Sequence, residues 1–311
     1  MSSPAEAAEP AGPAERAGHR TPGVLVVVGD LLEDIVVWAT EPIRAATDSA
    51  AQVFRSRGGS AANVAAHAAT LAPTRFIGRV GDDGAGRALE SALAATGVDV
   101  RVQRAGRSGA VVLIVAPDGE RTMFPDRAAA AELEDVDPGW LDGVDWVHVP
   151  SYGLEHEPMR GEVRRLVALA RERGATVSVD ASSTGLLETL GVERALGWIA
   201  GLRPDVLFAN ETEATLLGVA SGGGIAASVA RRVVVKHGPE PTEVFDDGRL
   251  DVRVPVAPVA SVRDLTGAGD AFAAGYVAAA LAGADATGCC LAGHRLAASV
   301  IASPGGDVNG G

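Results

Sequence analysis

A glycine-rich segment followed by a carboxylate is the part of this chain whose residue types best suit chemistry. It runs Asp264-Leu265-Thr266-Gly267-Ala268-Gly269-Asp270, and an apolar helical pattern follows at once. Small residues at a helix start leave backbone N–H groups uncovered, and with the helix dipole these groups bind anions. A carboxylate there makes sense if it takes a proton from a hydroxyl that attacks the anion, so Asp270 indicates phosphoryl transfer. The alternative is an Asp that only caps the helix.

A second segment, Gly58-Gly59-Ser60-Ala61-Ala62-Asn63, lies far upstream. In this order the two segments resemble the two signatures of the PfkB (ribokinase-like) family of carbohydrate and nucleoside kinases, in which the later one commonly reads D-T-x-G-A-G-D-x-F. The resemblance extends from about residue 24 to residue 304. It implies ATP-dependent transfer of the γ-phosphoryl group to a hydroxyl of a sugar, expected to be a primary one.

The proposed chemistry and the resemblance assign roles to the residues of both segments. Asp270 is expected to be the catalytic base, with an anion hole formed by the backbone N–H groups of Gly267, Ala268, Gly269 and Asp270. The acceptor is expected to be bound by Asp34, Gly58, Gly59 and Asn63. A carboxylate accepts hydrogen bonds from two neighbouring hydroxyls, which suits Asp34, but Asp30 is a rival and a solvated loop acid is the alternative.

Asn210 and Glu213 follow a predicted strand, and ligands collect at the carboxyl ends of strands in open α/β sheets. Their spacing resembles the family's N-x-x-E motif, so Glu213 is expected to hold Mg²⁺ through water, and Asn210 to organise the nucleotide phosphates. A helix cap without any metal is the alternative. The resemblance also implies nucleotide contacts from Lys236, Gly238 and Thr266, a K⁺ site at Asp264, and adenine near His294. A structural role is the alternative for His294.

Val-rich strands that alternate with Ala/Leu-rich helices predict an α/β fold with a mostly parallel central sheet flanked by helices. The expected strands include 74–80 and 176–180, the expected helices include 86–96 and 187–200, and 243–245 and 250–254 are expected to form a hairpin around Asp246-Asp247-Gly248. The resemblance implies that this fold is three-layered and ribokinase-like. Residues 23–304 are expected to form this domain, with a disordered tail at 1–22 and a loose C-terminus at 305–311. Strands without intervening helices predict a small second sheet from insertions at about 35–57 and 98–125, with Trp38, Phe54 and Phe124 on its apolar face. The resemblance implies that this sheet is a lid over the sugar site. Extra edge strands of the main sheet are the alternative.

The composition excludes several classes of function. The net charge of −13 disfavours nucleic acid or an anionic membrane as partner, and no apolar run is long enough for a transmembrane helix. Adjacent Cys289 and Cys290 are predicted to be buried thiols, which favours a reduced, cytoplasmic protein. No P-loop motif occurs, and no Gly-x-Gly-x-x-Gly follows the first strand. Lids of the resembled family often pair with another subunit, so a homodimer is also expected.

Departures from the family pattern make the acceptor hard to assign. Ser60 stands where ribokinases proper tend to carry Lys, and Leu265 replaces a common Thr. Glu240-Pro241 occupies the place of a usual second glycine, and Arg127-Ala128-Ala129-Ala130 replaces a common R-G-A-N. A nucleoside kinase, adenosine- or pseudouridine-like, is therefore an alternative to a sugar kinase. A regulator that binds sugar or nucleotide without turnover is a third hypothesis.

Overall fold

The computed structural model describes residues 23–259, 261–263 and 265–302, so the predicted tail, the predicted loose C-terminus and Asp264 lie outside it. A nine-stranded sheet forms the centre of the fold, in the order β13-β12-β11-β10-β9-β8-β1-β4-β5. The seven strands from β11 to β5 pair in parallel, whereas β12 pairs antiparallel with both β11 and β13 and is the strand that runs in the opposite direction. The strands are β1 (Val24–Val28), β4 (Thr74–Val80), β5 (Asp99–Arg104), β8 (Val144–Pro150), β9 (Thr176–Asp180), β10 (Val206–Asn210), β11 (Arg232–His237), β12 (Glu240–Asp246) and β13 (Arg249–Val254).

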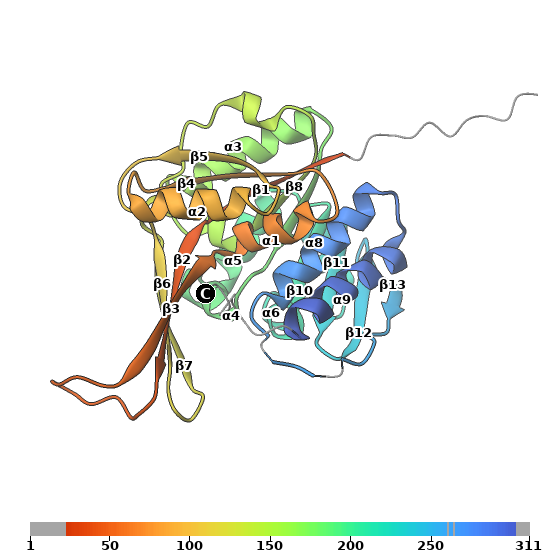
Figure 1. Ribbon diagram of the computed structural model, residues 1–311. Coiled ribbons are helices and arrows are strands. Elements are labelled where there is room, and N and C mark those ends of the chain that lie inside the picture. Colours follow the sequence, from red (N-terminus) through yellow and green to blue (C-terminus); the bar gives the residue numbers. More distant parts are fainter. Residues whose placement is uncertain (1–22, 260, 264, 303–311) are drawn as a thin grey trace, which may run out of the picture.

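Helices cover both faces of this sheet and create two apolar cores (Figure 1). In β1, Val26 and Val28 point into one core and Leu25 and Val27 into the other, which is the period of two expected of a strand buried on both faces. One core contains α3 (Met159–Glu172), α4 (Thr184–Leu190), α5 (Val192–Gly201), α6 (Glu211–Leu216) and α7 (Gly223–Val229). The other contains α1 (Ser60–Ala69), α2 (Gly84–Ala94), α8 (Ala268–Leu281) and α9 (Ala286–Ala302). The predicted three-layer fold is confirmed.

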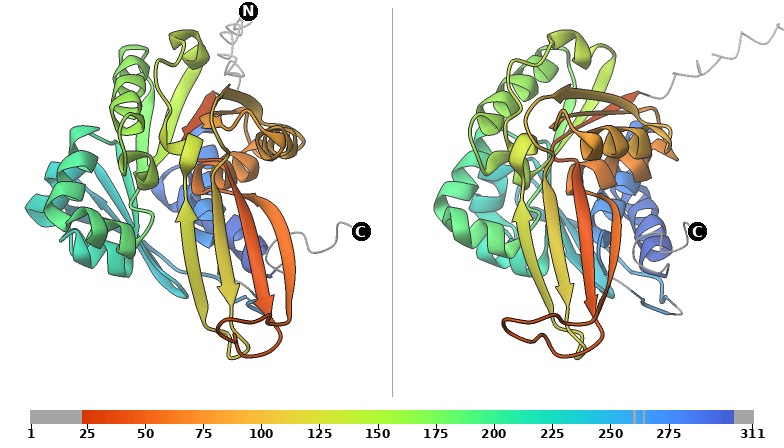
Figure 2. Two further views of the ribbon diagram at one scale, coloured as in Figure 1. Left: turned by 90° about the vertical axis from the view of Figure 1, so that its left-hand side faces the viewer. Right: turned by 60° about the vertical axis from the view of Figure 1, so that its left-hand side comes forward.

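A second, four-stranded sheet extends away from the body (Figure 2). We call it the lid; it contains β2 (Leu32–Ala39), β3 (Ala51–Gly58), β6 (Ala110–Val115) and β7 (Arg121–Asp126), in the order β3-β2-β6-β7. Val36 lies opposite Phe54 and Leu113, while Phe124 lies opposite Val112. Because paired residues share a face, Phe54 and Phe124 point to opposite faces of the lid. The predicted single aromatic face is therefore wrong.

Two details of the predicted elements are also wrong. The strand near residues 98–104 was assigned to the lid, but β5 pairs in parallel with β4 at the edge of the main sheet, where Arg75 contacts Asp99 at 2.7 Å. Helix α2 connects β4 to β5, so these three elements form a βαβ unit. The helix expected at 187–200 is split into α4 and α5 at Gly191, whose φ of 82° belongs to the left-handed region.

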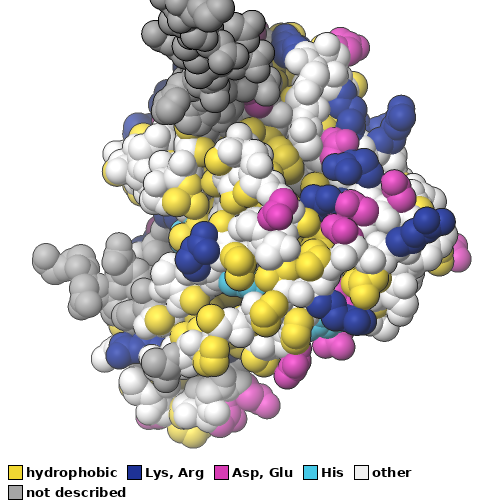
Figure 3. Space-filling view, turned by 90° about the vertical axis from the view of Figure 1, so that its right-hand side faces the viewer, with side chains coloured by type: hydrophobic (Ala, Val, Ile, Leu, Met, Phe, Trp, Pro, Cys, Tyr) yellow, Lys and Arg dark blue, Asp and Glu magenta, His cyan; other side chains and the backbone are white. Residues whose placement is uncertain are grey.

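Short 3-10 helices occupy three loops: η1 (Ala128–Ala131), η2 (Pro138–Leu141) and η3 (Ser151–Leu154). Figure 3 shows the molecule from the right-hand side of Figure 1. On this face basic and acidic side chains are interspersed with hydrophobic ones. Within the described residues, no helix combines the length and apolarity needed to cross a membrane. Cys289 and Cys290 are free thiols buried in α9, as predicted, and burial raises their thiol pKa values to about 11 and about 12.

Candidate active site

The start of α8 places Asp270 beside the start of α1. Gly267 precedes α8 in the left-handed conformation, with φ of 76°, and no side chain caps the helix. This arrangement suits an anion site, because the N–H groups of a first helical turn lack partners within the helix. Of the predicted anion-hole donors, Ala268 already donates its N–H to the Leu265 carbonyl at 3.2 Å. An incoming phosphate therefore meets chiefly the neighbouring amides.

Both carboxylate oxygens of Asp270 accept hydrogen bonds from α1. Ser60 donates through Oγ to Oδ1 at 2.7 Å, and Asn63 donates through Nδ2 to Oδ2 at 3.2 Å. Burial raises the pKa of Asp270 to about 7, although both hydrogen bonds act to lower it. A base with a pKa near neutrality is well matched to general base catalysis at physiological pH. The structure thus unites the two signature segments around one carboxylate.

Asp34 lies at the base of the lid, where β2 meets the glycine pair. Burial, and then the charge of Asp30, raise the pKa of Asp34 to about 6 against the opposing charge of Arg57. A Cβ on Gly58 would lie 2.2 Å from the Asp34 carboxylate, and a Cβ on Gly59 would lie 2.6 Å from the Asp30 carbonyl oxygen. Glycine is thus required at positions 58 and 59, because the end of β3 passes too close to Asp34 and to the backbone of Asp30 for a larger residue. Whether they also admit a sugar, as the sequence predicts, stays a prediction.

Asp30, the rival to Asp34, already has strong partners. Its Oδ2 pairs with Arg127, and its Oδ1 accepts the N–H of Ala61 at 3.3 Å. Arg127 also contacts Glu155 at 2.8 Å and stacks over the ring of Tyr152 at 4.3 Å. Because these contacts neutralise Asp30, Asp34 is the carboxylate of the two that has more capacity to bind hydroxyl groups.

A buried charged cluster lies at the carboxyl ends of β9, β10 and β11. Lys236 contacts Asp180 at 3.0 Å, and Glu213 is only 3% exposed. Burial and then the charge of Asp180 raise the pKa of Glu213. Burial acts to lower the pKa of Lys236, but Asp180 and Glu213 outweigh it and raise that pKa. The Lys236 ammonium also lies 3.4 Å from the position of a Cβ on Gly269, so it lies directly beside the proposed anion hole.

Asn210 and Glu213 form a capping box at the start of α6. Glu213 donates its N–H to Asn210 Oδ1 at 2.9 Å, and Asn210 donates its N–H to Glu213 Oε2 at 2.8 Å. This is the structural alternative that the sequence left open, and it does not exclude a metal. Each carboxylate oxygen has two lone pairs, so Glu213 keeps free acceptor positions beside Asp180.

Arg121 extends from the lid strand β7 to the loop before α8 and donates to Thr266 Oγ1 at 3.3 Å. Within the lid, Arg121 pairs with Val115, and Val115 pairs with Trp38 of β2. Because paired residues share a face and Trp38 is four residues from Asp34 on the same strand, Arg121 and Asp34 lie on one face of the lid. The inner face of the lid is therefore the one that carries Asp34, Phe54 and Arg121. Val53 and Phe124 lie on the outer face.

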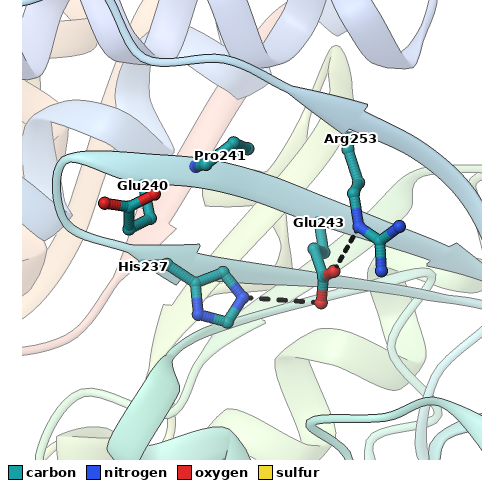
Figure 4. Close-up of a pocket in the computed structure, with 5 residues that line it drawn as sticks. All are labelled: His237, Glu240, Pro241, Glu243 and Arg253. Atoms are coloured by element: carbon teal, nitrogen blue, oxygen red, sulfur yellow. Dashed lines mark hydrogen bonds and ion pairs between the residues drawn. The ribbon is translucent and has the colours of Figure 1, made fainter.

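The loop between β11 and β12 contains Gly238, with φ of 62° and open space where a Cβ would be. Next to it lies a surface pocket of about 210 Å³ (Figure 4) lined by His237, Glu240, Pro241, Glu243 and Arg253. Glu243 bridges His237 at 3.5 Å and Arg253 at 2.6 Å. His294 lies on the opposite face of β12, where it shares a hydrogen bond of 2.8 Å with Thr242 and contacts the Phe272 ring. These two contacts fit the structural alternative, and the adenine contact of His294 stays a prediction.

Sequence reasoning missed three residues of this site: Arg57, Asp180 and Ser60 as a partner of the base. Asp180 ends a predicted strand whose bounds were correct, so its position at the carboxyl end was a usable signal. Arg57 and Ser60 flank the glycine pair and gave no signal of their own. Asp34, Asn63, Asp270, Glu213 and Lys236 were predicted, and the structure brings them to one end of the sheet and the base of the lid.

The fold and this arrangement define a ribokinase-like phosphotransferase with an alcohol group as acceptor. Residues 24–309 match the family model described as pfkB family carbohydrate kinase, and the chain belongs to that family. It is 36% identical over 239 residues to the ATP-dependent ribose-1-phosphate kinase of Halopiger xanaduensis, covering 74% of this chain and 75% of the relative. It is 31% identical over 274 residues to the fructokinase of Klebsiella pneumoniae, covering 82% and 84%.

The fold is also similar to solved structures. A putative ribokinase II from E. coli, in complex with ATP and Mg²⁺, matches with a TM-score of 0.78 at 22% identity, covering 91% of this chain and 94% of that one. At this level of identity the similarity concerns the fold. The predicted family and class of enzyme are confirmed.

Proposed function

We propose that this protein transfers the γ-phosphoryl group of ATP to a hydroxyl, expected to be primary, of a sugar, with Asp270 as the base. The observation that carries the proposal is the meeting of Asp270, at the start of α8, with Ser60 and Asn63 of α1. An acceptor hydroxyl that replaces one of these donors would lie against a carboxylate with a pKa of about 7. Asp34 would hold a second hydroxyl, and Asn63 would contribute its amide.

The developing charge would be held by the N–H groups around Gly269 and by the ammonium of Lys236. Asp180 and Glu213 leave the cluster with more negative than positive charge, which is the donor set that Mg²⁺ prefers. These carboxylates would hold Mg²⁺, Glu213 through water, and the ion would neutralise phosphate charge when bound. Asn210, Gly238 and Thr266 are the proposed contacts of the nucleotide. A K⁺ site at Asp264 stays a prediction, since that residue lies outside the described chain.

A nucleoside kinase is the second candidate within the same chemistry. The inner face of the lid carries Val36, Phe54 and Leu113, and Trp38 on the same face is 53% exposed. These side chains offer an apolar surface for the nucleobase of a nucleoside acceptor. Phe124 would not take part, because it lies on the outer face.

Exposed Val53 and Phe124 on the outer face support a homodimer through the lid, because exposed apolar groups favour association. Static light scattering of the wild-type protein and of Val53→Lys would test it; a monomeric wild type would contradict it. A cytoplasmic location stays a prediction, as does the absence of nucleic-acid and membrane partners.

A coupled assay of ADP release tests the proposed function. Ribose, fructose, their phosphates, adenosine and pseudouridine would be supplied with ATP, with either Mg²⁺ or excess EDTA, and in K⁺ or Na⁺ buffer. We expect Mg²⁺-dependent release with at least one neutral sugar. Turnover on nucleosides alone would favour the second candidate. Tight ATP binding without release for any acceptor would contradict both and favour a binding regulator.

A further inference from the structure

A continuous chain of hydrogen bonds connects the lid to the proposed base. Arg57, near the end of lid strand β3, donates through Nη1 to Asn63 Oδ1 at 3.0 Å. Asn63, in the first turns of α1, donates through Nδ2 to Asp270 Oδ2 at 3.2 Å. All three side chains are only partly exposed. The chain therefore links three elements, β3, α1 and α8, through one amide.

Arg57 and Asp270, the two ends of this hydrogen-bond chain, determine the orientation of the Asn63 amide. A guanidinium only donates hydrogen bonds, and an ionised carboxylate only accepts them. Between them, an amide can satisfy both neighbours in one orientation, with its oxygen toward Arg57 and its NH₂ group toward Asp270. Without Arg57 the amide loses the partner that holds its oxygen, and it becomes free to rotate. Its donation to the base then weakens.

The charges around Arg57 argue against a role in binding an anionic acceptor. Arg57 interacts electrostatically with both Asp34 and Asp270. The charges of Asp180 and Asp30 act on Asp270, and the charge of Asp270 in turn acts on Lys236, Arg57 and the neutral phenol of Tyr152. His67 lies near Arg57 and Asp30 is paired with Arg127. Two carboxylates thus share one guanidinium at this point, which leaves no surplus of positive charge for a phosphate on the acceptor.

We propose that Arg57 is a positioning residue of the transfer reaction: it orients the Asn63 amide so that Asn63 donates to Asp270, and it thereby couples the base to the lid. This inference rests on the proposed function. It separates Arg57 from the other lid arginines, since Arg55, two residues earlier on β3, pairs with Glu33 at 3.0 Å and is 65% exposed.

The test compares Arg57→Met and Arg57→Lys with the matched control Arg55→Met, in the full-length protein. Methionine keeps the apolar stem of arginine and removes its donors. The readout is the dependence of kcat/KM for the acceptor on pH at saturating ATP, whose acid limb reports the base before the acceptor binds. We expect Arg57→Met to move this limb upward by about one pH unit, the effect of losing one hydrogen bond to a carboxylate. Arg57→Lys is expected to move it less, and Arg55→Met not to move it.

A double-variant comparison shows whether Arg57 acts through Asn63. Adding Arg57→Met to Asn63→Ala should move the acid limb by only the direct effect of the lost charge, which is less than the movement that Arg57→Met causes in the wild-type background. A fully additive shift would overturn the inference, and so would an Arg57→Met variant that raises only the KM of phosphorylated acceptors. Thermal melting of each variant shows whether it is folded.

The inference also has a readout that needs no turnover. Titration of ¹³C-labelled Asp carboxylates by NMR, with Asp270→Asn to identify the resonance, measures the same shift directly. If no acceptor were phosphorylated, the proposed function would fail, while an Asp270 titration that Arg57→Met shifts more in the wild-type background than in Asn63→Ala would still support the positioning role. An unchanged titration would refute it.

Discussion

Replacing Asp270 by Asn is expected to remove most of the turnover while making the folded protein more stable at alkaline pH. Asparagine has nearly the same shape, and its amide fits the site: its oxygen can accept from Asn63, and its NH₂ group can donate to the Ser60 hydroxyl, which also accepts hydrogen bonds. The variant should therefore fold. Loss of the general base is expected to lower kcat by about 100- to 10,000-fold.

The stability gain follows from the raised pKa of the carboxyl group. An ordinary Asp has a pKa of 3.8, and in the folded protein burial raises that of Asp270 to about 7. The folded state then binds the proton more tightly than the unfolded state, so ionisation destabilises the fold as pH rises from about 4 to about 7. Above that range the cost reaches at most about 4 kcal/mol, and the partial exposure of the side chain reduces it. Asparagine carries no charge and escapes this cost.

The assay measures Tm for wild type and Asp270→Asn between about pH 5 and pH 8.5, together with ADP release at each pH. We expect the variant to melt higher than wild type by an amount that grows from the acid end to about pH 7, reaches several degrees and then stays constant to the alkaline end. Binding of ATP should persist, since Asp270 is not proposed to hold the nucleotide. A difference in Tm that does not change with pH would refute the linkage argument. Near-normal kcat in the variant would refute the assignment of the base.

Three further substitutions test the neighbours of this base. Ser60→Ala removes the donor to Oδ1, so the acid limb of kcat/KM should move upward by up to about one pH unit with little change in Tm; an unmoved limb would show that Ser60 does not act on the base. Gly58→Ala places a Cβ within 2.2 Å of the Asp34 carboxylate, so KM for the acceptor should rise about tenfold or more while KM for ATP stays constant, both measured by steady-state kinetics. Lys236→Met leaves Asp180 and Glu213 without their cation and should destabilise the protein by about 3–5 kcal/mol in chemical denaturation. Added Mg²⁺ should recover part of that loss, and no recovery would argue against a metal at these carboxylates.

The strands of the main sheet could be predicted because their composition carries a strong local signal. The bounds of β4 and β9 agree with the sequence patterns at both ends. These strands are buried on both faces, so their runs of Val and other apolar residues reflect a single environment. The hairpin of β12 and β13 around Asp246-Asp247-Gly248 was predicted for a different reason, since its turn residues tolerate positive φ.

The assignment of β5 to the lid failed because periodicity reports which face of a strand is buried and not which sheet the strand joins. Residues 99–104 alternate in polarity, as an edge strand of either sheet would. The connection rule was the available signal: a helix was predicted between 86 and 96, and a strand-helix-strand succession predicts parallel pairing with the preceding strand. Applied to β4, that rule gives the observed position of β5.

Site residues that belong to a short sequence motif could be predicted. Contacts that form only because the fold brings distant segments together could not. Asp270, Asn63 and Glu213 belong to short patterns, and each is where those patterns place it. Asp180 and Lys236 lie 56 residues apart and meet because β9, β10 and β11 end at the same edge of the sheet. Arg57 reaches Asn63 because Gly59 turns the chain between β3 and α1 with φ of 96°. No local pattern encodes either contact.

The pKa of Asp270 resolves the conflict that a carboxylate at an anion site presents. The positive end of the α8 dipole and two hydrogen bonds favour its ionised form, and alone they would make it a weak base. Burial and the charges of Asp180 and Asp30 act in the opposite direction and prevail. The ammonium of Lys236 contacts both parts of the site: it pairs with Asp180, and it lies beside the start of α8 at Gly269. The groups that would bind phosphate are therefore also the groups that determine how strongly Asp270 holds a proton, so binding of the nucleotide and strength of the base are coupled through the same few charges.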